Sequence, residues 1–144
     1  MSSYPSIGSR WIDESRAPLY LLSFPTDPTD ELLLEMCAAR ERWAARARFP
    51  VAWVCDTTNL GNATAKQRRI LAEHLEKFEP HDLAWNQGSA IIVPNALLRG
   101  IVTAVFWVKS PRFPHQSFAT RNEALAWATQ RLQEGARASV AKSP

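Results

Sequence analysis

Short apolar segments alternate with amphipathic ones along this chain. Five segments of five to seven residues have the length of β-strands: residues 7–13, 19–25, 51–55, 88–94 and 115–119. The second, LYLLSFP, and the third, VAWVC, are apolar almost throughout, which is typical of strands that are covered on both faces. Only the short segment ESRAP separates the first two, so they are expected to form an antiparallel pair.

Four segments between and after these strands show the three- and four-residue apolar spacing of helices. The first helix is expected to begin at Asp27, which can cap it, with Pro28 in its first turn, and to end at Pro50. Its arginines, Arg40 among them, gather toward the C-terminal end, where the helix dipole favours positive charge. The second helix is predicted over about residues 64–78.

The third helix, residues 96–108, is apolar almost throughout and follows Asn95, which can cap it. Gly100 in its middle costs about 1 kcal/mol relative to alanine, which hints at a close approach by another group. A fourth helix, over residues 120–134, opens with Thr120 and Glu123 in capping-box spacing. Winding the third helix at about 100° per residue directs a broad apolar arc toward a core, and that arc contains Leu97, Leu98, Ile101, Val102, Val105 and Phe106.

This order of elements predicts an α/β protein with a single mixed, mainly parallel five-stranded sheet and four helices. Strands that alternate with helices imply parallel crossovers, and the leading hairpin makes the first strand the antiparallel one. One domain is expected over residues 7–133, with flexible termini at residues 1–6 and 134–144.

Three local patterns accompany this order. VAWVCDTTNL is a strand ending in a carboxylate and a hydroxyl-bearing loop, GSAIIVPNALLRGIVTAVFW is a strand, short loop and apolar helix, and FATRNEALAWA is a closing segment. With them, residues 7–133 resemble the STAS domain of anti-anti-sigma factors and the related SpoIIAA-like proteins. The resemblance implies a strand order of 1-3-2-4-5, four helices mostly on one face, and a regulatory, non-catalytic role in binding a protein partner.

The phosphorylation site of anti-anti-sigma factors is not found here. In that family a serine in the pattern Asp-Ser-Ser-Gly-Leu, near the start of the second helix, is phosphorylated by the partner kinase. The corresponding stretch is ATAKQRR, where Thr64 stands about where the aspartate would be and Ala65 and Lys66 occupy the serine pair. Unless Thr64 substitutes out of register, the chain is therefore more similar to the SpoIIAA-like branch, which shares the architecture without the switch.

Charge and hydropathy exclude two classes of partner. The net charge of +3 comes without a stripe of basic residues interleaved with stacking aromatics, so nucleic-acid binding is not expected. The apolar run at 96–108 contains Arg99 and falls short of the roughly 20 residues that a membrane span needs. The N-terminus lacks a basic segment followed by an apolar one, which favours a cytoplasmic location.

The cysteines and histidines do not form a chemical motif. Cys37 and Cys55 lack CxxC spacing and are expected to be buried thiols in a reducing compartment. His74, His81 and His115 lack the spacing of a zinc site, so solvated or core positions are expected for them, and no metal or other cofactor is predicted.

The loop that follows the strand at 51–55 is the first candidate site. Ligands of open α/β sheets gather at the carboxyl ends of strands, and the N-terminus of the next helix favours anions. The loop is expected to bind a partner or an anionic ligand, or else to be a polar turn whose side chains satisfy backbone groups. Its candidate residues are Asp56, Thr57, Thr58, Asn59, Thr64, Lys66 and Arg69.

The second candidate site is the strip of the third helix that carries Arg99, Thr103 and Trp107. Arginine and tryptophan are enriched at interfaces, so the strip is expected either to bind a protein partner or a second copy of the chain, or to be covered by the last helix. The first functional hypothesis is therefore a regulatory protein-interaction module. The alternative is a small-molecule or lipid-binding protein similar to CRAL-TRIO domains, with residues 96–108 lining the cavity. A small enzyme using the polar cluster at 56–58 is the third.

Overall fold

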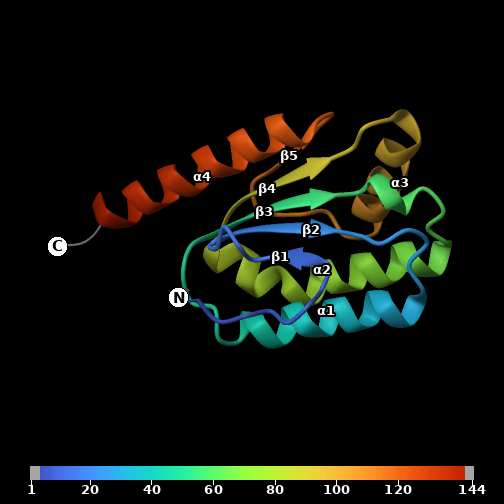
Figure 1. Cartoon of the computed structure of the whole chain (residues 1–144), viewed down its shortest axis with the longest axis horizontal. Coiled ribbons are helices and arrows are strands. Elements are labelled where there is room, and N and C mark those ends of the chain that lie inside the picture. The colour runs from blue at the N-terminus through green and yellow to red at the C-terminus, as the bar shows by residue number, and fades with distance from the viewer. Residues whose placement is uncertain (1–3, 142–144) are drawn as a thin grey trace.

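The computed structural model describes residues 4–141, with side chains up to Ala138, and confirms the α/β class (Figure 1). One mixed sheet of five strands is combined with four α-helices and one 3-10 turn. The elements in chain order are β1 (Ile12–Asp13), β2 (Leu19–Ser23), α1 (Asp30–Ala44), β3 (Val51–Asp56), η1 (Thr58–Leu60), α2 (Ala65–Trp85), β4 (Asn86–Ile92), α3 (Ala96–Val108), β5 (His115–Phe118) and α4 (Arg121–Ala141).

The strands lie in the order β1-β2-β3-β4-β5, with β1 antiparallel to β2 and every other neighbouring pair parallel. The order 1-3-2-4-5 that the resemblance to STAS domains implied is therefore wrong for this chain. The reason is that each strand–helix–strand crossover returns to the adjacent position, so that Leu21 of β2 lies opposite Val54 of β3 and Val54 lies opposite Ala90 of β4.

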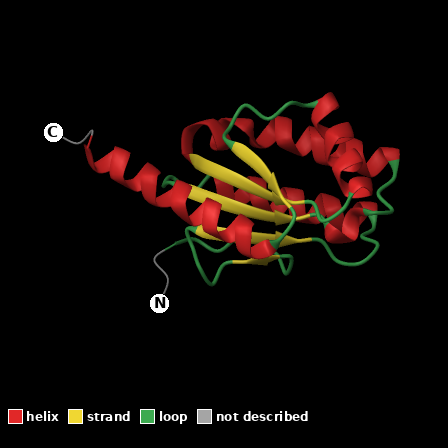
Figure 2. Ribbon diagram, turned by 90° about the horizontal axis from the view of Figure 1, so that it is seen from above, coloured by secondary structure: helices red, strands yellow, loops and turns green. Residues whose placement is uncertain are grey.

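Three helices cover one face of the sheet and α4 covers the other (Figure 2). Crossovers of one hand that step in the same direction place their helices on the same side, which accounts for α1, α2 and α3. Side chains of β3 alternate between the two cores: Val51 and Trp53 face the three helices, whereas Ala52 and Val54 face α4. Both faces are buried, as the continuous apolar strands predicted.

The packing of α4 depends on small residues at the interface. Ala124 and Ala128 of the helix are fully buried against the sheet. At Gly88 of β4, a Cβ atom would lie 2.9 Å from the Trp127 ring and 3.1 Å from Cγ of Arg131. The absence of a side chain at Gly88 therefore lets α4 approach the strand closely.

Two predicted helix boundaries are wrong at the first helix. Asp27 has a left-handed backbone, with φ of 47°, and the helix is capped by Thr29, whose hydroxyl accepts from the Leu32 N–H at 3.2 Å. The helix also ends at Ala44, well before Pro50. The cap predicted at Asn95 is confirmed, since its side chain accepts from the backbone N–H of Leu98 in the first turn of α3.

Other elements differ in length from the prediction. β1 is only Ile12–Asp13, shorter than the predicted 7–13, and next to it the Trp11 carbonyl accepts from the Ser23 N–H of β2 at 2.9 Å. The second helix continues past residue 78 to Trp85 despite Pro80, because His81 and Asp82 are buried against the rest of the fold and hold its last turns in place. Tertiary packing thus overrides the helix-breaking tendency of proline.

Hydrogen bonds and helical structure extend into the two segments predicted as flexible termini. Near the N-terminus, the Pro5 carbonyl accepts a hydrogen bond from Trp43 Nε1 at 3.1 Å, and Ser6 Oγ lies 2.8 Å from Glu14. At the other end, α4 continues to Ala141 instead of ending at residue 134. Residues 1–3 and 142–144 of the two predicted termini lie outside the described residues.

Candidate functional site

The loop after β3 uses its polar atoms within the fold. Asp56 ends β3, and its Oδ1 accepts from the Thr58 backbone N–H at 2.9 Å and from the Thr58 hydroxyl at 2.5 Å. Thr57 is buried and its hydroxyl donates to the last carbonyl of β4 at 2.6 Å. Asn59 donates to a carbonyl just beyond β2 at 2.7 Å. The structure brings these residues together as a turn that ties neighbouring strands to one another.

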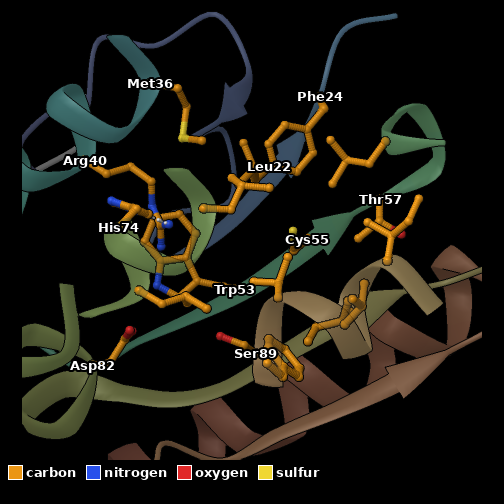
Figure 3. Close-up of a pocket in the computed structure, with 18 of the residues that line it drawn as sticks. Leu22, Phe24, Met36, Arg40, Trp53, Cys55, Thr57, His74, Asp82 and Ser89 are labelled. Atoms are coloured by element: carbon orange, nitrogen blue, oxygen red, sulfur yellow. Dashed lines mark hydrogen bonds between the residues drawn. The ribbon is translucent and has the colours of Figure 1, made fainter. Parts of the chain in front are cut away.

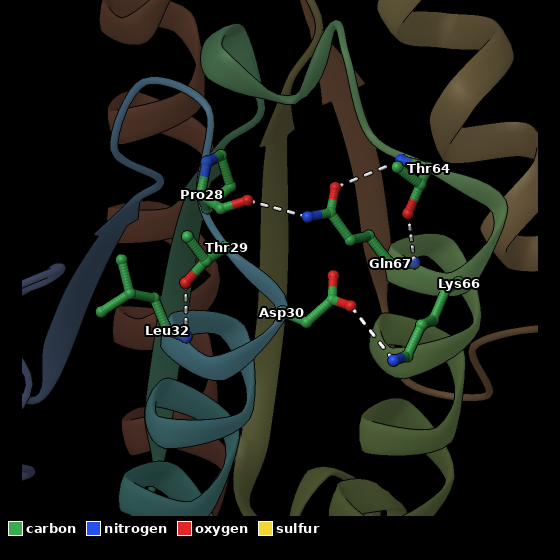
Figure 4. Close-up of polar contacts among 7 residues, drawn as sticks. All are labelled: Pro28, Thr29, Asp30, Leu32, Thr64, Lys66 and Gln67. Atoms are coloured by element: carbon green, nitrogen blue, oxygen red, sulfur yellow. Dashed lines mark hydrogen bonds and ion pairs between the residues drawn. The ribbon is translucent and has the colours of Figure 1, made fainter.

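The start of α2 serves a similar purpose (Figure 4). The Thr64 hydroxyl accepts from the backbone N–H of Gln67 at 3.0 Å, and the Gln67 side-chain oxygen accepts from the Thr64 N–H at 3.1 Å, which is a capping box. The Gln67 amide also donates to a carbonyl just before α1 at 2.8 Å. Lys66 forms an ion pair with Asp30 at 3.2 Å, and Arg69 is exposed. Most of the predicted loop residues therefore have structural partners.

The predicted strip on α3 does face solvent. Arg99, Thr103 and Trp107 are all exposed, and Trp107 reaches 83%. The fourth helix does not cover them, because it packs on the opposite face of the sheet. Leu97, predicted to face the core, is 63% exposed, and an added Cβ at Gly100 would meet nothing within 4 Å. The close approach that Gly100 suggested is therefore not found within the described chain.

On its other side, α3 lines a half-open cavity between the sheet and the helices α1 and α2 (Figure 3). The cavity has a volume of about 120 Å³ and its walls are mostly apolar. Every element on this side of the sheet contributes to it. Typical wall residues are Leu22 of β2, Met36 of α1, Leu71 of α2, and Ile101, Val105 and Phe106 of α3.

One end of the cavity holds a partly buried arginine, Arg40. Its guanidinium carbon lies 4.2 Å from the ring centroid of Trp53 and 4.2 Å from that of Phe78. Contact with two aromatic faces stabilises a cation that has lost part of its hydration. No carboxylate oxygen among the described residues lies within 4.0 Å of this guanidinium. The charge of Arg40 is thus held by aromatic rings instead of by a direct ion pair.

His74 connects Arg40 to Glu41 through two hydrogen bonds. Arg40 Nη1 donates to His74 Nε2 at 2.8 Å, and His74 Nδ1 lies 2.9 Å from Glu41 Oε2. Because a guanidinium can only donate, Nε2 is the acceptor, and the proton resides on Nδ1, which donates to Glu41. Burial lowers the pKa of His74 well below its usual value, and the charges of Arg40 and Lys77 lower it further. His74 is therefore neutral, and it lies in the core, one of the two kinds of position expected for the histidines.

A carboxyl and a hydroxyl lie at the same end. In Figure 3, Asp82 and Ser89 lie on the side of the Trp53 ring away from Arg40 and His74. Asn86 holds both, donating to Asp82 Oδ1 at 3.0 Å and to Ser89 Oγ at 2.9 Å. Burial raises the pKa of Asp82 to about 6, against the opposing attraction of Arg40. Asp82 and Arg40 are thus opposite charges that face one cavity without touching.

The two thiols are unreactive by this geometry. Cys55 lines the cavity, and burial raises its pKa to about 12; burial likewise raises the pKa of Cys37 to about 11. Both thiols are protonated at neutral pH. Cys37 is buried, as expected, whereas Cys55 is partly buried.

Comparison with protein-family models, with curated proteins and with solved structures found no match. Over the described residues, no cluster of three or more histidine, cysteine, aspartate or glutamate side chains could hold a metal ion. Of the helices in the described part of the chain, none combines the length and apolar character needed to traverse a bilayer.

The polar end of the cavity was not predicted as a candidate site from the sequence. Arg40 is grouped above with the other arginines that complement the dipole of α1, although it belongs to the buried stripe that Leu33, Met36 and Trp43 form at helical spacing. Its position in that stripe is the available signal. A charged residue in phase with an apolar stripe marks a buried polar site.

Proposed function

We propose that this protein is a small-molecule-binding module, whose ligand occupies the cavity beneath α3. The observation that carries the proposal is the combination of an apolar cavity with a cluster of buried polar groups at one end. Ligand sites typically have this composition, with apolar walls that supply affinity and a few polar groups that fix orientation. The role that the sequence assigned to residues 96–108 as a cavity wall agrees with the positions of Ile101, Val102 and Val105.

The packing of the cavity also supports a ligand. Protein interiors have few voids larger than a water molecule, because an unfilled void forfeits contacts. An apolar molecule of suitable size would restore those contacts, and its own apolar surface would be removed from water at the same time. Engineered apolar cavities of roughly 150 Å³ bind benzene, so the size found here suits a ring of that kind.

The experiment is binding of benzene-sized apolar probes, monitored by thermal unfolding and by the methyl resonances of the cavity wall. The proposal expects probe-dependent stabilisation of the parent protein. Val105→Phe, which fills the cavity, should abolish it. Thr103→Phe adds the same side chain to the exposed face of α3 and should leave it unchanged. Equal responses from the parent and from Val105→Phe would show that the probes bind elsewhere and would refute the proposal.

A second candidate function is the protein-interaction role that the resemblance to STAS domains implied. The observation in its favour is the exposed face of α3, where Arg99 and Trp107 are both exposed with no covering element from the described chain. Trp107→Ala and Arg99→Glu are expected to weaken self-association or partner binding, measured by sedimentation velocity and by affinity capture. If both variants behave like the parent at every concentration, this face is not an interface.

A further inference from the structure

The polar end of the cavity indicates the chemical class of the ligand. We infer that the cavity receives a neutral molecule with a hydrogen-bond acceptor, such as a ketone or amide carbonyl oxygen, to which Arg40 Nε and Trp53 Nε1 donate. The inference rests on the proposed function, since it concerns the same cavity.

Two N–H donors in the cavity wall have no acceptor. Nε of Arg40 and Nε1 of Trp53 are both enclosed, and neither has a hydrogen-bond partner among the described residues. Buried donors in folded proteins are nearly always paired, because an unpaired donor loses its hydration without recompense. The guanidinium stacks 4.2 Å from the centre of the indole, so both donors belong to one stack. A carbonyl oxygen has two lone pairs and can accept from two donors. Both N–H groups are enclosed, so an acceptor in the cavity would reach them only where these side chains move.

The charges around Arg40 favour a neutral acceptor over an anion. Asp82 of α2 and Glu41 of α1 both attract the guanidinium, His74 is neutral, and the thiol of Cys55 is protonated. An ionised acid beside Arg40 would bring a further negative charge close to Asp82, in surroundings where such charges repel strongly. A carbonyl oxygen would accept the hydrogen bonds without adding charge.

The volume limits the part of the molecule that is recognised. A cavity of about 120 Å³ accommodates a single six-membered ring or a short branched chain. A cyclic ketone with one ring therefore reproduces the inferred features in their simplest form: an apolar body, a carbonyl oxygen and no charge.

Three probes of similar shape separate the alternatives: cyclohexanone, methylcyclohexane and cyclohexanecarboxylate. Each is titrated into the full-length protein at about pH 8, where the Asp82 carboxyl is ionised. Binding is measured from the indole N–H resonances of the tryptophans, and the signal of Trp53 is the one that disappears in Trp53→Phe. Cyclohexanone should bind about tenfold more tightly than methylcyclohexane, which is the usual effect of one or two hydrogen bonds. It should also shift the Trp53 signal downfield.

Paired variants test the donors. Trp53→Phe retains an aromatic ring beside Arg40 but lacks the N–H, so it should lose most of the preference for the ketone over the hydrocarbon. Trp107→Phe makes the same chemical change on the exposed face of α3 and should retain the full preference. The shift of the Trp53 signal in the parent protein provides the same information without any substitution.

The outcomes distinguish this inference from the proposed function. If the ketone and the hydrocarbon bind equally and the Trp53 signal does not move, the inference is wrong while the apolar cavity remains a binding site. Tighter binding of the carboxylate than of the ketone would also overturn the inference, in favour of an anionic ligand. If none of the three probes binds, the inference and the proposed function fail together.

Discussion

The buried carboxyl of Asp82 should make the stability of this protein depend on pH in a way that one substitution removes. Its pKa is raised from 3.8 to about 6, mainly by burial, so the folded state binds this proton more tightly than the unfolded chain does. For a group of this kind the stabilising contribution is complete below the unfolded pKa and is lost as the pH rises through the folded pKa. The Asp82→Asn variant lacks this titration and keeps an oxygen that can accept from Asn86.

The magnitude follows from the shift. A difference of about 2 pKa units corresponds to about 3 kcal/mol of unfolding free energy between low and high pH, and about half of it develops between about pH 5 and pH 8. Urea denaturation of the parent and of Asp82→Asn at pH 5 and at pH 8 measures the unfolding free energy of each protein. The stability of the variant relative to that of the parent should increase as the pH rises, by about 1.5 kcal/mol. Because the subtraction is between the two proteins, the titration of the histidines cancels.

A surface carboxyl provides the control. The pKa of Asp13 is lowered by hydrogen bonds from Ser15, so this carboxyl is ionised throughout that range in both the folded and the unfolded state. Asp13→Asn should therefore differ from the parent by the same amount at both pH values. If the stability difference between Asp82→Asn and the parent is also the same at both pH values, Asp82 is not buried in the way described. The electrostatic account of the cavity is then wrong.

Four further substitutions test the packing of the fold by chemical denaturation. Gly88→Ala should destabilise the protein by about 1–3 kcal/mol, because the new Cβ meets the Trp127 ring; Gly135→Ala on α4 should be close to neutral, because only a flexible glutamine side chain must move. Thr64→Ala should cost about 1 kcal/mol through loss of the capping box. Trp107→Ala should change the unfolding free energy by less than about 0.5 kcal/mol, since its side chain is exposed; a larger loss would show that α3 packs differently.

The fold could be predicted from the sequence to the extent that local patterns determine it. Apolar strands alternating with amphipathic helices gave the class, and the caps at Asn95 and Thr120 lie where side-chain chemistry placed them. The strand order and the length of α2 depend instead on contacts between distant segments. The burial of His81 and Asp82, which extends α2 through Pro80, is an example of such a contact.

The candidate site was harder to predict for the same reason. Arg40 lies on α1, whereas His74 and Asp82 lie on α2, 34 or more residues further along the chain, so no short sequence motif joins the three. The polar loop at Asp56 drew attention because its residues are adjacent in sequence, but hydrogen bonds within the turn and to neighbouring strands account for most of its polar atoms. A cluster of polar residues that are adjacent in sequence can be recognised from the sequence. A cluster of polar residues from different helices can be recognised only once the fold is known.

The third helix has one face that lines the cavity and another that is exposed to solvent. Ile101 and Val105 form a wall of the interior space, while Trp107, on the same rigid rod, stands in solvent. A ligand in the cavity and a partner on the exposed face would both contact this one helix, and any coupling between the two sites would act equally in both directions. Coupling of this kind would let binding at one face of α3 change the affinity for a ligand or partner at the other face.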